Sequence, residues 1–281
     1  MTSAKRILLW IGSLEDTAEF RHVTAVIQNS VELWHLPNVD AALQAAANSD
    51  PEPLVICLSE THPGQIHGEE ILQLTSRWPL SKIVVVGSSL ADGQRRSGPS
   101  VSGVLTVPWH DLPSRMIVWL HRLESGQPSS LADATTFRRE ERWLVDARTT
   151  NTPHTVLDLA TQVRVTVAAS TDTTAEAVSE LVTAAGGTVE QTITGKPPIQ
   201  DRADVVIWDL HDSPEFQLEW IRLLTCQNPR RIIALLCSFP RSDTAQAAMA
   251  AGATVVLGRP TDGEALRGVL LLAETALSAT S

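Results

Sequence analysis

An aspartate follows a short apolar run in the second half of the sequence. The run from Val205 to Trp208 is followed by Asp209, and helical spacing begins near Phe216 and continues to Leu224. This pattern is typical of a buried strand that leads through a loop into a helix. A carboxylate at such a strand end could act as a nucleophile or as a metal ligand. Asp209 is therefore the first candidate for chemistry in this chain.

A second set of candidate ligands lies in the stretch ETHPGQIHGE. It contains Glu60, His62, His67 and Glu69, whose imidazole and carboxylate groups could bind zinc. The two histidines lack the helical or hairpin spacing of familiar zinc sites, so we interpret the stretch as a hydrated loop. Sequence motifs of the common hydrolases, nucleotide-binding proteins and zinc proteases do not occur. We therefore expect no enzymatic activity.

Composition and charge limit the classes of partner. The 281 residues are enough for two domains, and 43% of them are hydrophobic, as in a globular protein. The net charge of −10 provides no general attraction to phosphate backbones, so nucleic acid is not an expected partner. The apolar run Ile7 to Ile11 is too short for a membrane span. Cys57, Cys226 and Cys237 are odd in number and widely spaced, which favours a reducing cytoplasm over a disulfide framework.

The second half of the chain alternates short apolar runs with segments of helical spacing. The runs predict strands at residues 163–169, 188–193, 204–208, 231–237 and 254–257. The helical spacing predicts helices at about residues 174–185, 216–224, 243–251 and 263–277. Gly186 and Gly252 stand where the first and third of these helices should end. The Lys-Pro-Pro segment at 196–198 stands where another helix could be.

The first half repeats the same order of elements. Its strands are expected at residues 6–11, 31–36, 54–58, 82–86 and 103–107. Its helices are expected near residues 15–28, 39–47, 69–77 and 112–123. Residues 91–102 are rich in Gly, Ser, Arg and Pro, so a helix there should be short or missing. Short apolar strands separated by helices indicate parallel strands that are buried on both faces.

We therefore predict an α/β protein with two doubly wound domains, each built on a five-stranded parallel sheet. The domains are expected at residues 1–126 and 161–281. The linker between them, residues 127–160, is expected to contain a helix. Trp143 and Leu144 could dock that helix onto a domain or a partner, and the alternative is a solvated spacer.

The second half resembles a response-regulator receiver domain, a flavodoxin-like module that accepts a phosphoryl group on an aspartate. The resemblance covers about residues 162–281 and rests on DVVIWDLHDSPEFQLEWIRLL, RIIALLCS and AGATVVLGRPTDGEALRGVL, which match the family in order and spacing. In receivers a carboxylate pair after the first strand holds Mg²⁺, while a Ser or Thr and a Lys contact the phosphoryl oxygens. The cation is needed because two anions must approach each other.

The resemblance places the phosphoacceptor at Asp209, the hydroxyl group at Ser238 and the lysine at Arg259, before Pro260. A guanidinium is a planar fork with a different reach from the compact ammonium of a lysine. A carboxylate facing such a guanidinium would be charge-satisfied without phosphate. We therefore interpret Asp209 as an inactive remnant paired with Arg259, and the alternative is a working phosphoacceptor.

The magnesium ligands of a receiver are missing from the matching positions. The carboxylate pair would fall at about Ala169 and Ser170, and neither is acidic. Asp172 is nearby but displaced toward the next helix. With one carboxylate in place of three, we expect the affinity for Mg²⁺ to collapse and no cofactor or metal to be held; Mg²⁺ belongs only to the phosphoacceptor alternative.

The first half resembles the same fold with less of the receiver signature. Ser88, at the end of KIVVVGS, keeps a matching residue type. The nucleophile, acidic and lysine positions fall on Leu58 or Ser59, on Ile11 and Gly12, and on Val107 before Pro108. Glu60 could mimic a phosphoaspartate if it turned into the pocket, but a glutamate at a strand end is more often solvated. Receiver chemistry is therefore excluded in this half.

A rival pattern begins at the same aspartate. Asp209, Leu210 and His211 start like the DxHxxG signature of cobalamin-binding domains. The glycine of that signature is absent, and in that family the motif follows the first strand rather than the third. We therefore set this interpretation aside.

Receivers contact partners through the face formed by their fourth helix, fifth strand and fifth helix. Here the stretches AQAAMAAGA and EALRGVLLLAETAL carry more apolar residues than one buried stripe needs. The candidate interaction residues are Leu266, Val269, Leu270 and Ala273. They could form a surface for self-association or docking, and the alternative is packing against the domain's own sheet and the other domain.

These observations favour a cytoplasmic, non-catalytic regulatory or scaffold protein that acts through protein–protein contact, with a protein partner or as a homodimer. Neither nucleic acid nor a membrane is an expected partner. The first alternative is a phosphorylation-responsive regulator that uses Asp209. The second is a small-molecule sensor that binds at the C-terminal edge of the strands.

Overall fold

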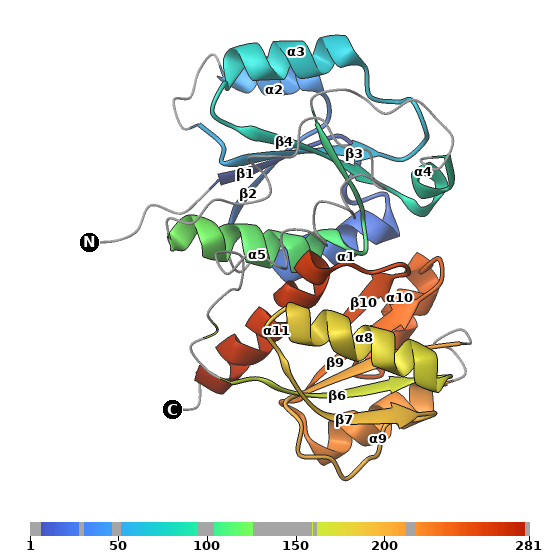
Figure 1. Ribbon diagram of the computed structural model, residues 1–281. Helices are drawn as coiled ribbons and strands as arrows, with labels where there is room; N and C mark the ends of the chain where they lie inside the picture. The colour runs from blue at the N-terminus through green and yellow to red at the C-terminus, as the bar shows by residue number, and fades with distance from the viewer. Residues whose placement is uncertain are drawn as a thin grey trace. The chain divides into compact units, whose positions relative to one another are not determined.

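The computed structural model describes residues 7–27, 31–46, 52–94, 104–125, 159, 162–211 and 217–278. Within them the chain forms two five-stranded sheets, shown in Figure 1. The contacts divide the chain into two compact units, one around each sheet. The predicted linker helix, with Trp143 and Leu144, lies outside the described residues, so this helix and the domain boundaries stay predictions.

The first sheet has the strand order β2-β1-β3-β4-β5. Its strands are β1 (Ile7–Ile11), β2 (Glu32–Leu36), β3 (Val55–Glu60), β4 (Lys82–Gly87) and β5 (Leu105–Pro108). The helices in this part of the chain are α1 (Ala18–Ile27), α2 (Val39–Ala46), α3 (Gly68–Arg77), α4 (Ser89–Gln94) and α5 (Leu112–Glu124). Helix α4 is described over Ser89–Gln94, and most of the stretch 91–102 lies outside the described residues, so a short or missing helix there stays a prediction.

The second sheet has the strand order β7-β6-β8-β9-β10. Its strands are β6 (Arg164–Ala169), β7 (Thr188–Thr194), β8 (Val205–Asp209), β9 (Ile232–Cys237) and β10 (Val255–Gly258). Its helices are α8 (Asp172–Ala184), α9 (Leu218–Gln227), α10 (Ser242–Ala250) and α11 (Gly263–Ser278). Residues 195–204, between β7 and β8, contain no helix, so the Lys-Pro-Pro segment does replace one.

The two sheets share one topology. In each, the strands follow the order second, first, third, fourth, fifth along the sheet, and all pairings are parallel. This is the order of the flavodoxin-like doubly wound fold, which confirms the predicted fold class. Parallel strands place their C-terminal ends at one edge of the sheet, where ligand sites of this fold lie. Asp209, the last residue of β8, lies at that edge.

Burial explains why the central strands are almost wholly apolar. Strands β3, β8 and β9 are buried at every position, because helices cover both faces of a parallel sheet. In the second unit, α8 lies beside α11 and α9 lies beside α10 (Figure 1). The lateral strands β2 and β7 are partly exposed. The alternation of apolar and polar residues is therefore weakest where the sheet is most buried.

Glycines end two helices of the second unit, as predicted. Gly186 follows α8 with a φ of +102°, and Gly252 follows α10 with a φ of +114°. Such positive values favour glycine at the C-terminal end of a helix. A Cβ at Gly252 would lie 2.0 Å from the Thr225 Oγ1 atom, so the close approach of α9 also requires glycine there.

The predicted interaction face of α11 is buried. Leu266, Val269 and Leu270 are 0% exposed and Ala273 is 2% exposed. All four belong to the hydrophobic core formed with strands of the second sheet. The prediction of an exposed docking surface at these residues is therefore wrong, because the helix packs them against its own sheet.

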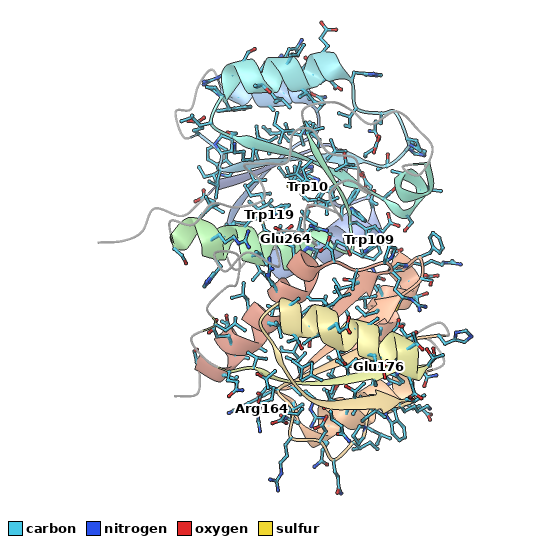
Figure 2. The ribbon with its side chains drawn as sticks, in the orientation of Figure 1. Trp10, Trp109, Trp119, Arg164, Glu176 and Glu264 are labelled. Carbon is cyan, nitrogen blue, oxygen red and sulfur yellow. The ribbon has the colours of Figure 1, made fainter. Side chains whose placement is uncertain are left out.

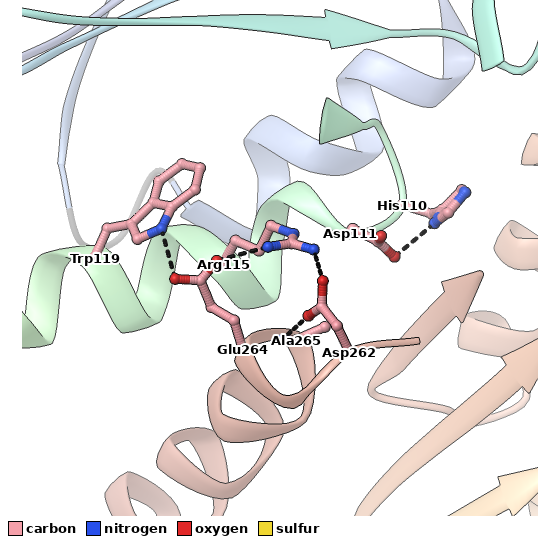
Figure 3. A network of polar contacts seen from close by, with 7 residues as sticks. All are labelled: His110, Asp111, Arg115, Trp119, Asp262, Glu264 and Ala265. Atoms are coloured by element: carbon pink, nitrogen blue, oxygen red, sulfur yellow. Dashed lines mark hydrogen bonds and ion pairs between the residues drawn. The ribbon is translucent and has the colours of Figure 1, made fainter. Parts of the chain in front are cut away.

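The N-terminus of α11 carries a buried polar network, drawn in Figure 3. The contacts group Ser114–His121 of α5 with the second unit. Within this unit the Arg115 guanidinium donates hydrogen bonds to the carboxylates of Asp262 and Glu264. Trp119 Nε1 donates to a Glu264 oxygen at 3.1 Å. The guanidinium pairs with both carboxylates and offsets part of their negative charge, which lowers the cost of burying these groups together.

Among the described residues, no helix is both long enough and apolar enough to cross a membrane.

Candidate functional site

Asp209 occupies the end of the third strand of the second sheet. Its backbone aligns with Leu236 on β9, and the next residue, Leu210, donates its N–H to the Leu236 carbonyl at 3.0 Å. This pairing holds the strand end in place. The Asp209 side chain is only 1% exposed, so its carboxylate is held within the site rather than in solvent.

Arg259 faces the Asp209 carboxylate. Its Nη1 atom lies 3.2 Å from Asp209 Oδ1 and 3.3 Å from Oδ2. Its Nη2 atom donates to the Leu210 carbonyl at 2.8 Å, and its backbone N–H donates to the Cys237 carbonyl at 2.8 Å. The Arg259–Pro260 peptide bond is cis. The structure therefore brings the predicted pair together and anchors the guanidinium on the backbone beside Asp209.

Burial and charge act in opposite directions on the Asp209 carboxyl group. Burial raises the pKa of Asp209, and it outweighs the lowering effects of Arg259 and His211. Burial also raises the pKa of the nearby Cys237 thiol to about 12, so this thiol stays protonated at neutral pH and is not a nucleophile.

Ser238 follows β9 at the position of the receiver hydroxyl group. Its side chain is exposed. No hydrogen bond joins it to Asp209 or Arg259, although all three residues are described. The structure thus assembles two of the three predicted site residues by direct contact, and the third lies at the adjoining strand end.

The residues around Asp209 do not fit a magnesium ion. At the positions expected for a carboxylate pair, Ala169 is buried and Ser170 is exposed. Asp172 instead begins α8, where its carboxylate accepts a hydrogen bond from the Thr194 hydroxyl. No group of three or more His, Cys, Asp or Glu in the described part of the chain could hold a metal ion. Asp209 therefore has a guanidinium beside it where Mg²⁺ chemistry would need further carboxylate oxygens.

The corresponding site of the first unit is filled by its own backbone and a serine. Gly12 follows β1 with a φ of +102°, and a Cβ there would lie 2.3 Å from the Ser59 Oγ atom. The Ser59 hydroxyl donates to the Ile11 carbonyl at 3.3 Å and is buried. This contact could not be predicted from the sequence, because a close approach between two strand ends leaves no local pattern.

Glu60 and Ser88 lie beside that filled site. The expectation that Glu60 is solvated is wrong, since the residue is only 8% exposed. Its carboxylate accepts a hydrogen bond from the Gly64 N–H at 3.1 Å. The Ser88 hydroxyl donates to the Thr61 carbonyl at 2.8 Å. These contacts tie the strand-end loops to each other.

Solved structures similar to this chain include receiver domains. A protein from Burkholderia pseudomallei, described as pilus assembly-related, is 23% identical, with 41% of this chain and 91% of that chain covered and a TM-score of 0.37. A response regulator from Thermotoga maritima is 20% identical, with coverages of 41% and 99% and a TM-score of 0.35. The similarity of this chain to these structures concerns the fold alone.

A third structure covers almost the whole chain. It is the C-terminus of RcsC from Escherichia coli, which contains a linker region and a phosphoreceiver domain. It is 11% identical, with 99% of this chain and 96% of that chain covered and a TM-score of 0.36. No family model and no curated protein match the sequence.

The site keeps the position of a receiver nucleophile without the surroundings that receiver chemistry requires. Asp209 is paired with a cation that is part of the chain, and the positions of the magnesium ligands hold Ala169 and Ser170. A permanent guanidinium partner stabilises the carboxylate as an anion but offers no exchangeable coordination positions. The arrangement therefore supports a structural ion pair at the strand edge.

Proposed function

We propose that this chain is a non-catalytic signalling or regulatory protein whose two receiver-like domains act by contact with protein partners. The observation that carries this proposal is the ion pair between Arg259 and the buried Asp209 carboxylate. Attack of an aspartate on a phosphoryl group brings two anions together and requires a bridging cation. Arg259 neutralises Asp209 without bridging it to a phosphoryl donor.

The first unit supports the same proposal independently. Its nucleophile position holds Leu58 or Ser59, and the Ser59 side chain packs against Gly12, the second position of the acidic pair of a receiver. Neither unit therefore combines a nucleophile with metal ligands. We place the protein in the cytoplasm, and the free cysteines Cys57, Cys226 and Cys237 are compatible with that reducing compartment.

Phosphoryl transfer provides the test. The protein is incubated with Mg²⁺ and acetyl phosphate, and separately with Mg²⁺ and beryllofluoride. Tryptophan fluorescence and migration on a phosphate-retarding gel are followed, because Trp208, one of eight tryptophans, is 4% exposed and directly precedes Asp209. We expect neither a fluorescence change nor a retarded band.

A gain-of-function variant tests whether the missing carboxylate and lysine of a receiver explain the expected lack of phosphorylation. Ser170→Asp combined with Arg259→Lys returns a carboxylate and a compact cation to the receiver positions, and we expect it to respond to Mg²⁺ more strongly than the wild type. A retarded band in the wild-type protein that disappears in Asp209→Ala would overturn the proposal and favour a phosphorylation-responsive regulator. The small-molecule sensor stays a prediction, which a thermal-shift screen with metabolites can address.

A further inference from the structure

Strand β7 forms an open edge of the second sheet. Among the described residues, it is the last strand in the sheet order and pairs with β6 alone. The Gly195 N–H donates to the Ala169 carbonyl at 2.7 Å. Because a parallel pair engages every second residue of a strand, Thr192 and Thr194 direct their backbone N–H and C=O groups to the open side. Such unpaired groups form a template for another strand.

A hollow runs between this edge and helix α8. Its volume is about 500 Å³, and it is lined by Asp172, Glu176, Ser179, Glu180, Thr192 and Thr194. The hydroxyl oxygens of Ser179 and Thr192 are 3.0 Å apart, and the Thr194 hydroxyl donates to Asp172. These contacts place the Thr192 and Thr194 side chains on the α8 side of the sheet. A strand added to β7 would therefore direct every second side chain toward α8.

The α8 side of the hollow is acidic. Asp172, Glu176 and Glu180 are spaced four residues apart and share one stripe of the helix. All three are exposed, and no ion pair with a cation joins any of them within the described residues. Glu176 is labelled on α8 in Figure 2. Glu190, exposed on β7, adds a further negative charge. The charge of this surface is complementary to a cationic partner.

The spacing of the carboxylates matches an extended chain. Four residues of an α-helix advance about 6 Å along its axis. Two residues of a β-strand advance about 6.6 Å. Basic side chains at alternate positions of an added strand would therefore meet successive carboxylates of α8, whereas adjacent basic residues would point to opposite faces of the sheet.

We propose that the β7 edge and the acidic stripe of α8 bind an extended peptide segment that carries Lys or Arg at alternate positions and adds to β7 as a sixth strand. A second copy of this chain is the weaker candidate, because pairing two β7 edges would bring two acidic stripes together. This inference rests on the proposed function in that it assigns a surface and a partner class to protein contact. The proposed surface uses no residue of the Asp209 site. A failure of the phosphoryl-transfer test would therefore refute the proposed function, whereas a failure of the test below would refute only this surface.

The experiment measures binding of a fluorescein-labelled peptide of alternating Lys and Thr to the full chain by fluorescence anisotropy at low salt. Thr192→Pro removes an N–H on the open side and leaves the ladder with β6 intact, since proline is tolerated where a strand N–H faces solvent. We expect this substitution to weaken binding at least roughly tenfold. Glu176→Gln should weaken binding roughly threefold.

Matched controls separate this site from general charge attraction. Glu219→Gln makes the same charge change at an exposed position of α9, away from α8, and should leave the affinity unchanged. A peptide of the same composition with contiguous lysines should bind more weakly. Circular dichroism and thermal unfolding check that each variant folds. If Thr192→Pro does not fold, Glu176→Gln still tests the proposed site.

Three results would overturn the proposal. The first is absence of binding to the alternating peptide. The second is equal weakening by Glu219→Gln and Glu176→Gln, or equal affinity for the two peptides, which would indicate non-specific attraction. The third is a dimer in sedimentation velocity that Thr192→Pro dissociates, which would assign the edge to a second copy of the chain. Hydrogen-exchange protection of the Thr192 and Thr194 amides on peptide addition would support the proposal that a peptide adds to β7.

Discussion

Asp209 shows how one side chain is held between burial and charge. Burial favours the protonated carboxyl group, whereas the guanidinium of Arg259 at 3.2 Å favours the anion. The balance leaves the pKa of Asp209 above its ordinary value of 3.8. Arg259 therefore reduces the cost of this buried charge without removing it.

The raised pKa predicts how stability depends on pH. A carboxyl group with a higher pKa in the folded state binds its proton more tightly there, so its contribution to stability is full at low pH and is lost as the pH rises through the folded pKa. Asp209→Asn stays neutral, so we expect its free energy of unfolding to rise relative to the wild type as the pH increases from the ordinary pKa of 3.8 through the higher folded-state pKa. Urea unfolding across that range measures the difference. A relative loss of stability at high pH would instead show that the ion pair dominates.

Helix α11 shows that an apolar surface pattern is ambiguous at the scale of one element. Its wide apolar stripe is compatible with a docking face, but Leu266, Val269, Leu270 and Ala273 pack into the core of the second unit. Its first turn is also buried, since Glu264 is 4% exposed and is paired with Arg115. The apolar stripe of α11 is wide because the helix is buried on more than one side.

Burial of α11 predicts that a charge on its inner face unfolds the second unit. Leu270→Glu places a carboxylate at a position that is 0% exposed, and we expect it to lower the free energy of unfolding by about 4 kcal/mol or more. Thr275→Glu introduces the same charge at an exposed position of this helix and should change it by less than about 1 kcal/mol. Denaturant unfolding compares the two. A folded Leu270→Glu variant that changes only the oligomeric state would restore the docking interpretation.

At the scale of the whole molecule, charge separates the classes of partner. The net charge of −10 is unfavourable for an extended polyanion, whereas the acidic stripe of α8 favours a local cationic segment. The two expectations share one physical cause, the excess of carboxylates over basic side chains.

The same charge predicts that the protein does not bind nucleic acid. We expect no retardation of duplex or single-stranded DNA in a gel-shift experiment at low salt, where electrostatic attraction is strongest. A basic protein of similar size serves as the positive control. Retardation that weakens steeply as salt is added would contradict the expectation and would reveal a basic surface.

Much of the fold could be predicted from the sequence. The apolar runs, the helical spacing and the helix-ending glycines at 186 and 252 located the elements, because these signals arise from neighbouring residues. The missing helix at Lys-Pro-Pro also followed from local chemistry. For the candidate site, the sequence identified Asp209 and Arg259 and the loss of acidic residues at Ala169 and Ser170.

Only the tertiary structure decided which of these residues meet and which faces are covered. It showed the contact between Asp209 and Arg259, 50 residues apart in the chain, and the packing of Ser59 against Gly12. It also showed that the apolar residues of α11 are buried and that, within the described part of the chain, β7 leaves an open edge beside three carboxylates. The physical reason is that local spacing determines secondary structure, whereas burial and pairing depend on the packing of elements that are distant in the sequence.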